Sequence, residues 1–342
     1  MRLSLGFEPA WFHKRCGVRF TENWHKDPTY RYDALKKMKA ELNRRFPQVP
    51  YWARARDDDL ATVSGCYGVH VIARVFGLPL RYAPDRWPVL EPGKTLSIRE
   101  IEKLDPQKLL EGPFVEELFR QMELIESKWG KVNGYLNWQG ILNNAFQIRG
   151  RDIFLDMYQR PGFVHAFFSK IKEVMIELAK VVQERQRQSG FYIDQLSVSN
   201  CTMNMISPEM YREFLLCHDR DISYEFERFG VHTCNWNINP YVDVLKKLPK
   251  IGYLDMGMET DMARVKATFP KARRAVIYGP TKFQNASYAE LQRDMLKIYR
   301  ELSPCDVVVA DIRYSTPDER VHELLEICKG LEAGGREESF GP

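Results

Sequence analysis

The alternation of strand-like and helical segments constrains the fold of this chain more than any other feature of its sequence. Short apolar runs predict strands at residues 60–64, 134–138, 191–198, 231–234, 251–256, 274–278 and 305–310. Longer amphipathic stretches predict helices at residues 162–190, 208–229, 241–248, 261–269, 287–302 and 317–329. Such alternation is typical of parallel β/α architecture. The pattern predicts a (β/α)8 TIM barrel with additional N-terminal helices and with one strand still to be found.

Helix starts and local composition divide the chain further. Ser207 precedes Pro208, and Thr316 precedes Pro317, which is the usual arrangement of a capping residue before a proline in the first helical turn. We expect residues 1–50 to form a helical flank that contains no strand, and residues 51–330 to form the barrel. Residues 331–342 are rich in Gly and Glu, and we expect them to be a disordered tail.

Composition excludes several classes of protein. The 342 residues carry 50 Lys and Arg against 46 Asp and Glu, without a basic block, so no nucleic-acid partner is expected. No apolar run reaches the roughly 18 residues that would span a bilayer, and the start of the chain does not resemble a secretion signal. The 7 cysteines are scattered and odd in number, which argues against a disulfide framework. We therefore expect a cytoplasmic protein with free thiols and no membrane contact.

Polar side chains at the ends of the predicted strands are the candidates for chemistry, because active sites of β/α barrels lie at that face. His232 and Cys234 are two residues apart and would point to the same side of a strand. Imidazole and thiolate are preferred zinc ligands, and a catalytic zinc site has three protein ligands and one open position. We expect Asp311 to be the third ligand, with Cys201 as the alternative. An isolated histidine–cysteine pair is also explained by packing in the barrel.

Other strand ends and loops provide candidate substrate-binding and catalytic residues. The segment 51–59 packs arginines, carboxylates and aromatics before a predicted strand, and a solvated charged loop explains it equally well. Trp138, Gln139 and Asn143 could orient a planar polar ligand, although a capped helix start would also account for them. From these segments and the predicted strand ends we select Asp58, Asp59 and Asp255 as catalytic candidates. The substrate-binding candidates are Arg54, Arg56, Trp138, Gln139, Asn143, Asn235 and Trp236.

Four stretches, taken in order, resemble the uroporphyrinogen decarboxylase family, which includes corrinoid-dependent methyltransferases. They are residues 150–161 (GRDIFLDMYQRP), 207–214 (SPEMYREF), 231–235 (VHTCN) and 315–321 (STPDERV). The resemblance covers roughly residues 50–330 and implies a (β/α)8 barrel with extra N-terminal helices.

The resemblance divides between two branches. The decarboxylases carry an N-terminal arginine-rich glycine loop that binds substrate carboxylates, and Arg15 and Arg19 match it poorly. The methyltransferases carry a histidine–cysteine zinc pair, here His232 and Cys234. Their third ligand is usually a cysteine shortly before a Thr-Pro helix start, where this chain has Asp311. A carboxylate in place of a thiolate would make the site harder and suit an oxygen or nitrogen donor.

The leading hypothesis is a zinc-dependent methyltransferase that moves a methyl group between a small O-, N- or S-methyl substrate and a corrinoid (cobalamin) on a partner protein. Trp138 and Trp236 would offer flat contact surface to the corrinoid. The runner-up is a tetrapyrrole decarboxylase that uses Arg54, Arg56, Asp58 and Asp59 without a metal. A non-catalytic barrel that binds a tetrapyrrole or metabolite is the third hypothesis, since fold does not fix function. A homodimer is compatible with each.

Overall fold

A parallel sheet of six strands forms the centre of the molecule. The computed structural model describes residues 1–49, 56 and 58–338, and for residues 58 and 332–338 it describes the backbone. The sheet order is β1-β8-β7-β6-β5-β4, and every neighbouring pair is parallel. The strands are β1 (Arg2–Phe7), β4 (Gln195–Ser199), β5 (Arg228–His232), β6 (Ile251–Met256), β7 (Arg273–Ile277) and β8 (Asp306–Ile312).

Two irregular segments continue this sheet towards a closed barrel. Gln139 forms a parallel bridge to Ser199 at the end of β4, and Asn133 forms a parallel bridge to Thr62. The run predicted at 60–64 therefore contributes one bridge, at Thr62, and the run predicted at 134–138 is flanked by bridges at Asn133 and Gln139; neither forms a regular strand. With β1 they bring the number of strand positions along the chain to eight, and the predicted (β/α)8 class is confirmed.

The eighth strand lies where none was expected. β1 pairs with β8 from Arg2 opposite Asp306 to Phe7 opposite Ile312. Leu5 and Phe7 alternate with less buried neighbours, which is the pattern of a half-buried strand. The expectation that residues 1–50 contain no strand is wrong, because this short run completes the sheet. The helices expected in that segment are present as α1 (Pro9–Cys16), α2 (Glu22–Lys26) and α3 (Pro28–Arg45).

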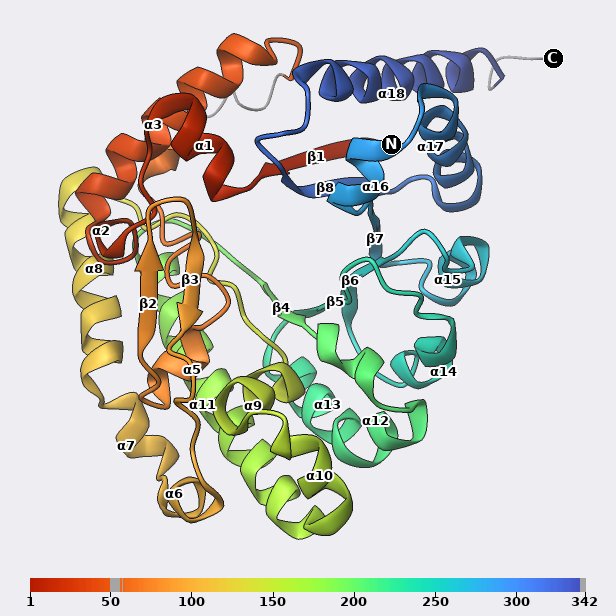
Figure 1. Ribbon diagram of the computed structural model, residues 1–342. Coiled ribbons are helices and arrows are strands. Elements are labelled where there is room, and N and C mark those ends of the chain that lie inside the picture. The colour runs from red at the N-terminus through yellow and green to blue at the C-terminus, as the bar shows by residue number, and fades with distance from the viewer. Residues whose placement is uncertain (50–55, 57, 339–342) are drawn as a thin grey trace.

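Helices cover the outside of the sheet (Figure 1). The Ser207 side chain accepts a hydrogen bond from Met210 N at 3.2 Å, which confirms the predicted helix start. The last helix extends to residue 338, so the predicted disordered tail begins too early. The helices after the first three are α5 (Val71–Val75), α6 (Ile98–Lys103), α7 (Pro106–Leu110), α8 (Pro113–Trp129), α9 (Ile141–Arg149), α10 (Asp152–Gln159), α11 (Pro161–Gln188), α12 (Pro208–Phe214), α13 (Leu216–Glu225), α14 (Val242–Leu245), α15 (Met262–Thr268), α16 (Pro280–Asn285), α17 (Tyr288–Leu302) and α18 (Asp318–Glu338).

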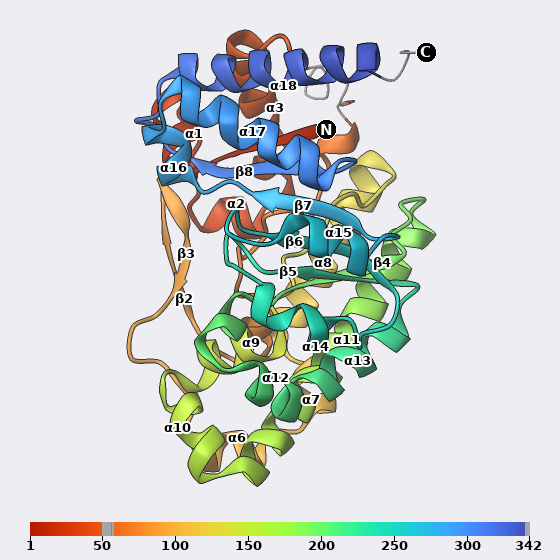
Figure 2. The same cartoon turned by 90° about the vertical axis from the view of Figure 1, so that its right-hand side faces the viewer.

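The segment between the N-terminal helices and β4 adds a hairpin to the barrel. Its antiparallel strands β2 (Leu80–Ala83) and β3 (Arg86–Leu90) stand at one side of the molecule (Figure 2). Short 3-10 turns are η1 (Asp58–Leu60), η2 (Cys201–Met205) and η3 (Asn239–Tyr241). Among the described residues, no helix has the length and apolarity needed to cross a membrane.

Candidate metal centre

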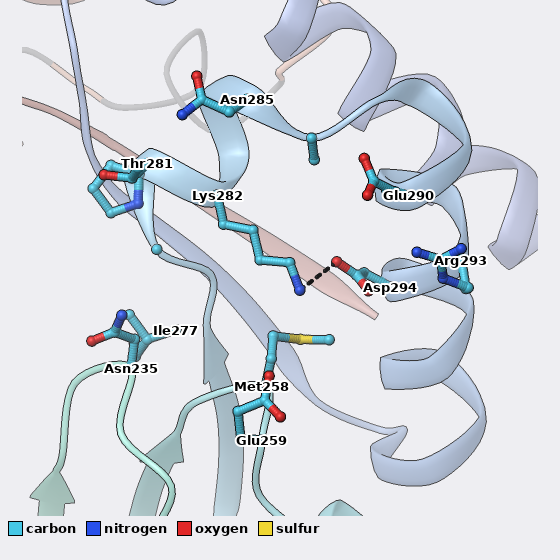
Figure 3. Close-up of a pocket in the computed structure, with 13 residues that line it drawn as sticks. Asn235, Met258, Glu259, Ile277, Thr281, Lys282, Asn285, Glu290, Arg293 and Asp294 are labelled. Carbon is cyan, nitrogen blue, oxygen red and sulfur yellow. Dashed lines mark ion pairs between the residues drawn. The ribbon is translucent and has the colours of Figure 1, made fainter.

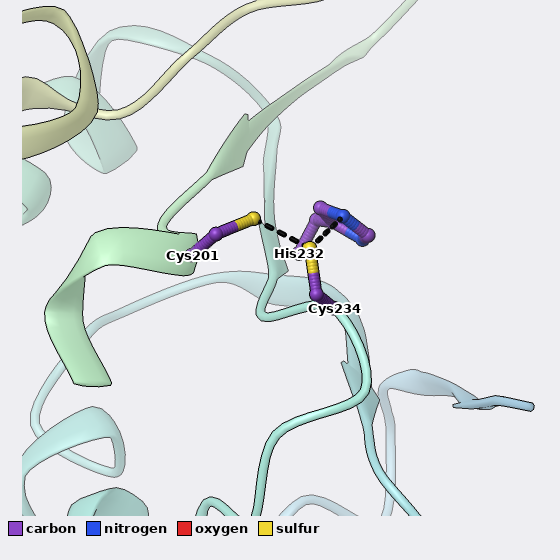
Figure 4. Close-up of side chains that lie close together, drawn as sticks. All are labelled: Cys201, His232 and Cys234. Carbon is purple, nitrogen blue, oxygen red and sulfur yellow. Dashed lines mark hydrogen bonds between the residues drawn. The ribbon is translucent and has the colours of Figure 1, made fainter. Parts of the chain in front are cut away.

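Two cysteines and a histidine converge at the carboxyl ends of β4 and β5 (Figure 4). Cys201 opens the turn η2 directly after β4, and His232 is the last residue of β5. One ligand atom from each of Cys201, His232 and Cys234 lies within 4.8 Å of the others. The two Sγ atoms are 2.6 Å apart, and Cys234 Sγ is 3.1 Å from His232 Nε2. This spacing lets all three side chains bind one ion.

The His232 ring is oriented by a buried carboxylate. Asp255 is fully buried on β6, and its Oδ2 accepts a hydrogen bond from His232 Nδ1 at 2.5 Å. The same carboxylate accepts from Thr233 N at 2.6 Å and from the Tyr253 hydroxyl at 3.0 Å. A histidine that donates through Nδ1 leaves Nε2 free to bind a metal. Asp255, selected as a catalytic candidate, therefore acts here by positioning His232.

Cys234 reaches the cluster through its backbone conformation. β5 ends at His232, so the two side chains do not share a strand as the spacing predicted. Cys234 has φ 62°, in the left-handed region that non-glycine residues rarely adopt. This turn directs its thiol towards His232 and Cys201. Unusual backbone of this kind is often found at functional sites.

The turn that carries Cys201 is held by Gln139 and Asn143. Asn143 Oδ1 accepts hydrogen bonds from Thr202 N, at 3.0 Å, and from the Thr202 hydroxyl. Its Nδ2 donates to Gln139 Oε1 at 2.7 Å. Both amides are nearly buried. The amides of Gln139 and Asn143, both selected as substrate-binding candidates, are thus occupied in fixing the turn next to Cys201.

A second buried network, which was not foreseen from the sequence, holds the other side of that turn. Asn200 N donates to His232 O at 2.7 Å, and Asn200 Nδ2 donates to Asp219 Oδ2 at 2.8 Å. The Tyr211 hydroxyl donates to the same carboxylate. Burial raises the pKa of Asp219 to about 6, although these two donors oppose the shift. A methyl group on Gly140 would lie 1.7 Å from Asn200 Oδ1, so this close approach requires glycine.

The pKa values of Cys201, His232 and Cys234 depend on the contacts among these three side chains. The bond with Cys234 lowers the pKa of Cys201 to about 5, against burial and with help from His232. Burial alone would lower the pKa of His232, but its bonds to Asp255 and Cys201 raise that pKa to about 10. The Cys201 thiolate in turn raises the pKa of Cys234. These shifts make Cys201 the more acidic of the two thiols.

The structure favours Cys201 over Asp311 as the third ligand. Asp311 lies at the end of β8 with φ 55° and is not a member of the group of ligand atoms. Its charge contributes to the raised pKa of Cys234, and burial raises its own pKa. Cys305 precedes β8 at the opposite end of the strand.

The remaining sequence candidates are dispersed. Arg54 and the side chain of Asp58 lie outside the described residues. Arg56 and Asp59 are exposed, and Arg56 N donates to Asp59 Oδ2 at 3.0 Å, as in a local turn. Trp138 is 2% exposed, so its ring is part of the core and offers no flat surface to a ligand. Trp236 is 49% exposed and Asn235 is also exposed; both residues follow Cys234 directly in the chain.

Comparisons with known proteins agree with this architecture. A model of the family described as uroporphyrinogen decarboxylase (URO-D) matches residues 58–329. No curated protein matches the sequence. A solved structure of a methyltransferase from Methanosarcina mazei superposes with a TM-score of 0.67, covering 96% of this chain and 92% of that chain at 13% identity. At that identity the likeness shows a common fold.

Proposed function

Because this chain belongs to the uroporphyrinogen decarboxylase family, we propose that it is a zinc-dependent methyltransferase of that family with Cys201, His232 and Cys234 as metal ligands. The reaction moves a methyl group between a small O-, N- or S-methyl substrate and a corrinoid on a partner protein. The convergence of three ligand atoms within 4.8 Å at the strand ends is the observation that carries this proposal.

The donor set fits zinc. Two cysteines and one histidine are the protein ligands of a known class of catalytic zinc site, in which a fourth position stays open. A buried carboxylate behind the histidine is the usual partner of such a ligand, and Asp255 has that position. Bound zinc would supply a Lewis acid that holds the substrate heteroatom. With Cys201 in place of Asp311, the set is also soft enough for a sulfur donor.

The chain's own residues would prepare this site before any substrate arrives. Asp255 keeps His232 Nε2 free, while Asn143 keeps Cys201 in place through Thr202. The exposed ring of Trp236 follows the cluster and would provide contact area for the corrinoid. A preformed site loses less free energy on binding than one that must be ordered first.

The metal content of the purified chain tests the ligand assignment. We expect near one zinc per chain, with loss of most of it in each of the variants Cys201→Ala, His232→Ala and Cys234→Ala. Asp311→Ala is the matched control at the neighbouring strand end, and it should keep its zinc. Loss of zinc in Asp311→Ala with retention in Cys201→Ala would reverse the assignment of the third ligand.

A second measurement tests the reaction. Free methylcobalamin serves as the methyl donor, and its visible absorption changes when the methyl group leaves cobalt. We expect turnover with zinc-loaded chain and an added thiol or amine, and loss of turnover in His232→Ala.

A second candidate is a tetrapyrrole decarboxylase, because the matching family is described by that reaction. A zinc-free chain that releases carbon dioxide from a porphyrinogen would replace our proposal with that function.

A further inference from the structure

A pocket of about 660 Å³ with a mixed polar and apolar lining opens beside the loop that carries Cys234 (Figure 3). Asn235, the residue after this ligand, lines its edge, together with the loop after β6 and the start of α17. The exposed side chain of Asn235 lies beside the start of α16, since a methyl group on Gly279 would lie 3.1 Å from its Nδ2. The volume is within the range of small-molecule sites. The pocket and the metal centre therefore share one loop.

Several charged groups that line the pocket already have partners. Lys282 Nζ lies 2.8 Å from Asp294 Oδ2, which also accepts from the Tyr278 hydroxyl at 2.7 Å. The carboxylate of Glu290 accepts from Ser287 N and Oγ at the start of α17, at 2.7 and 2.8 Å. Lys282 and Asp294 therefore compensate each other, whereas Glu290 is held in place by Ser287 and keeps its negative charge near Arg293.

Two opposite charges in the pocket remain without such partners. Among the described residues, neither the Arg293 guanidinium on α17 nor the Glu259 carboxylate in the loop after β6 takes part in a hydrogen bond or ion pair. The side-chain amides of Asn235 and Asn285 likewise make no hydrogen bond to the part of the chain that the structure describes. Glu259 lies on the side of the pocket near Asn235, and Arg293 lies across from Asn235 on α17 (Figure 3).

We propose that this pocket binds a small zwitterion, with a carboxylate on Arg293 and a substituted ammonium on Glu259. Guanidinium and carboxylate are complementary in geometry, and both Arg293 and Glu259 are exposed, so a small ligand can reach each charge. The ammonium end then faces the loop of Cys234. This inference rests on the proposed function in one respect, because it makes a methylated amino acid the substrate that the metal centre would receive.

Three compounds of nearly equal shape test the charge pattern by calorimetric titration of the full chain. N,N-dimethylglycine carries both charges, 3-methylbutanoate lacks the cation, and N,N-dimethylethanolamine lacks the anion. We expect N,N-dimethylglycine to bind about tenfold tighter than either analogue, which corresponds to one charge-assisted contact. Equal binding of the three compounds, or no binding of N,N-dimethylglycine, would overturn the proposal.

Two variants assign each charge to its residue. Arg293→Gln should remove the preference for N,N-dimethylglycine over N,N-dimethylethanolamine, and Glu259→Gln should remove the preference over 3-methylbutanoate. Arg300→Gln, an exposed change on the same helix outside the pocket, is the control and should bind like the original chain. If the pocket variants keep both preferences, the assignment fails.

The binding result is independent of the proposed reaction. Zwitterion binding by a chain that holds no zinc and transfers no methyl group would retain the pocket and reject the function. Zinc binding and methyl transfer without zwitterion binding would retain the function and reject the pocket.

Discussion

The imidazole of His232 is suited to metal binding because the buried carboxylate of Asp255 fixes its other nitrogen. The sequence predicted both residues as strand-end polar groups, but it could not pair them. They are 23 residues apart, and their contact depends on the register between β5 and β6. The pair His232–Cys234 was predicted from its spacing, but the turn at Cys234, with φ 62°, which brings its thiol towards Cys201, was not. From the sequence, Asp311 is preferred to Cys201 as the third ligand, because the approach of the Cys201 and Cys234 thiols could not be read from the sequence.

Replacing Asp255 by Asn tests this positioning role. An Asn with Oδ1 still bonded to Thr233 N would present its amide NH2 to His232 Nδ1, which would have to accept. Nε2 would then carry the proton and could not bind a metal. We expect zinc affinity to fall by about 10–100-fold, as for other outer partners of metal-binding histidines. Competition with a chromophoric chelator measures the change.

The control for this variant is Tyr253→Phe. It removes another hydrogen bond to the same Oδ2 atom, at 3.0 Å, without altering the histidine tautomer. Its zinc affinity should stay near that of the original chain. Thermal unfolding of both variants shows whether each remains folded, and equal zinc affinity in folded Asp255→Asn would contradict the positioning role.

Elements were predictable where their periodicity was regular. Five of the predicted strands coincide in part with β4 to β8, and the long helix α11 matches its amphipathic stretch. The runs at 60–64 and 134–138 did not form regular strands, and they also contact each other through a side chain, since Tyr135 N donates to Ser64 Oγ. The turn η2 could not be predicted, because its hydrogen bonds reach Asn143 on α9 and Tyr241 in η3. Such contacts follow from packing and not from local propensity.

The hydrogen bond from Thr202 N to Asn143 Oδ1 predicts that a substitution on α9 destabilises the turn η2. Asn143→Ala leaves the partly buried Thr202 N–H without its acceptor, at a cost of about 1 kcal/mol in the free energy of unfolding. We expect faster hydrogen exchange in residues 202–205 and weaker zinc binding, because Cys201 begins this turn. Thr202→Val should have a smaller effect, since the backbone bond at 3.0 Å remains. Unchanged exchange in Asn143→Ala would show that the turn is held by its other contacts.

At the scale of the whole molecule, β1 makes the N-terminus part of the barrel and not an appendage. Leu5 pairs with Val309 of β8 and is 6% exposed. Leu5→Ala should therefore lower the free energy of unfolding by about 2–5 kcal/mol, as other core truncations of this size do. Urea denaturation measures the change. Val89→Ala on the hairpin strand β3, where the side chain is 48% exposed, is the matched control and should stay within about 0.5 kcal/mol. A Leu5→Ala cost as small as that of the control would mean that residues 1–50 form a separable flank, as their sequence alone suggested.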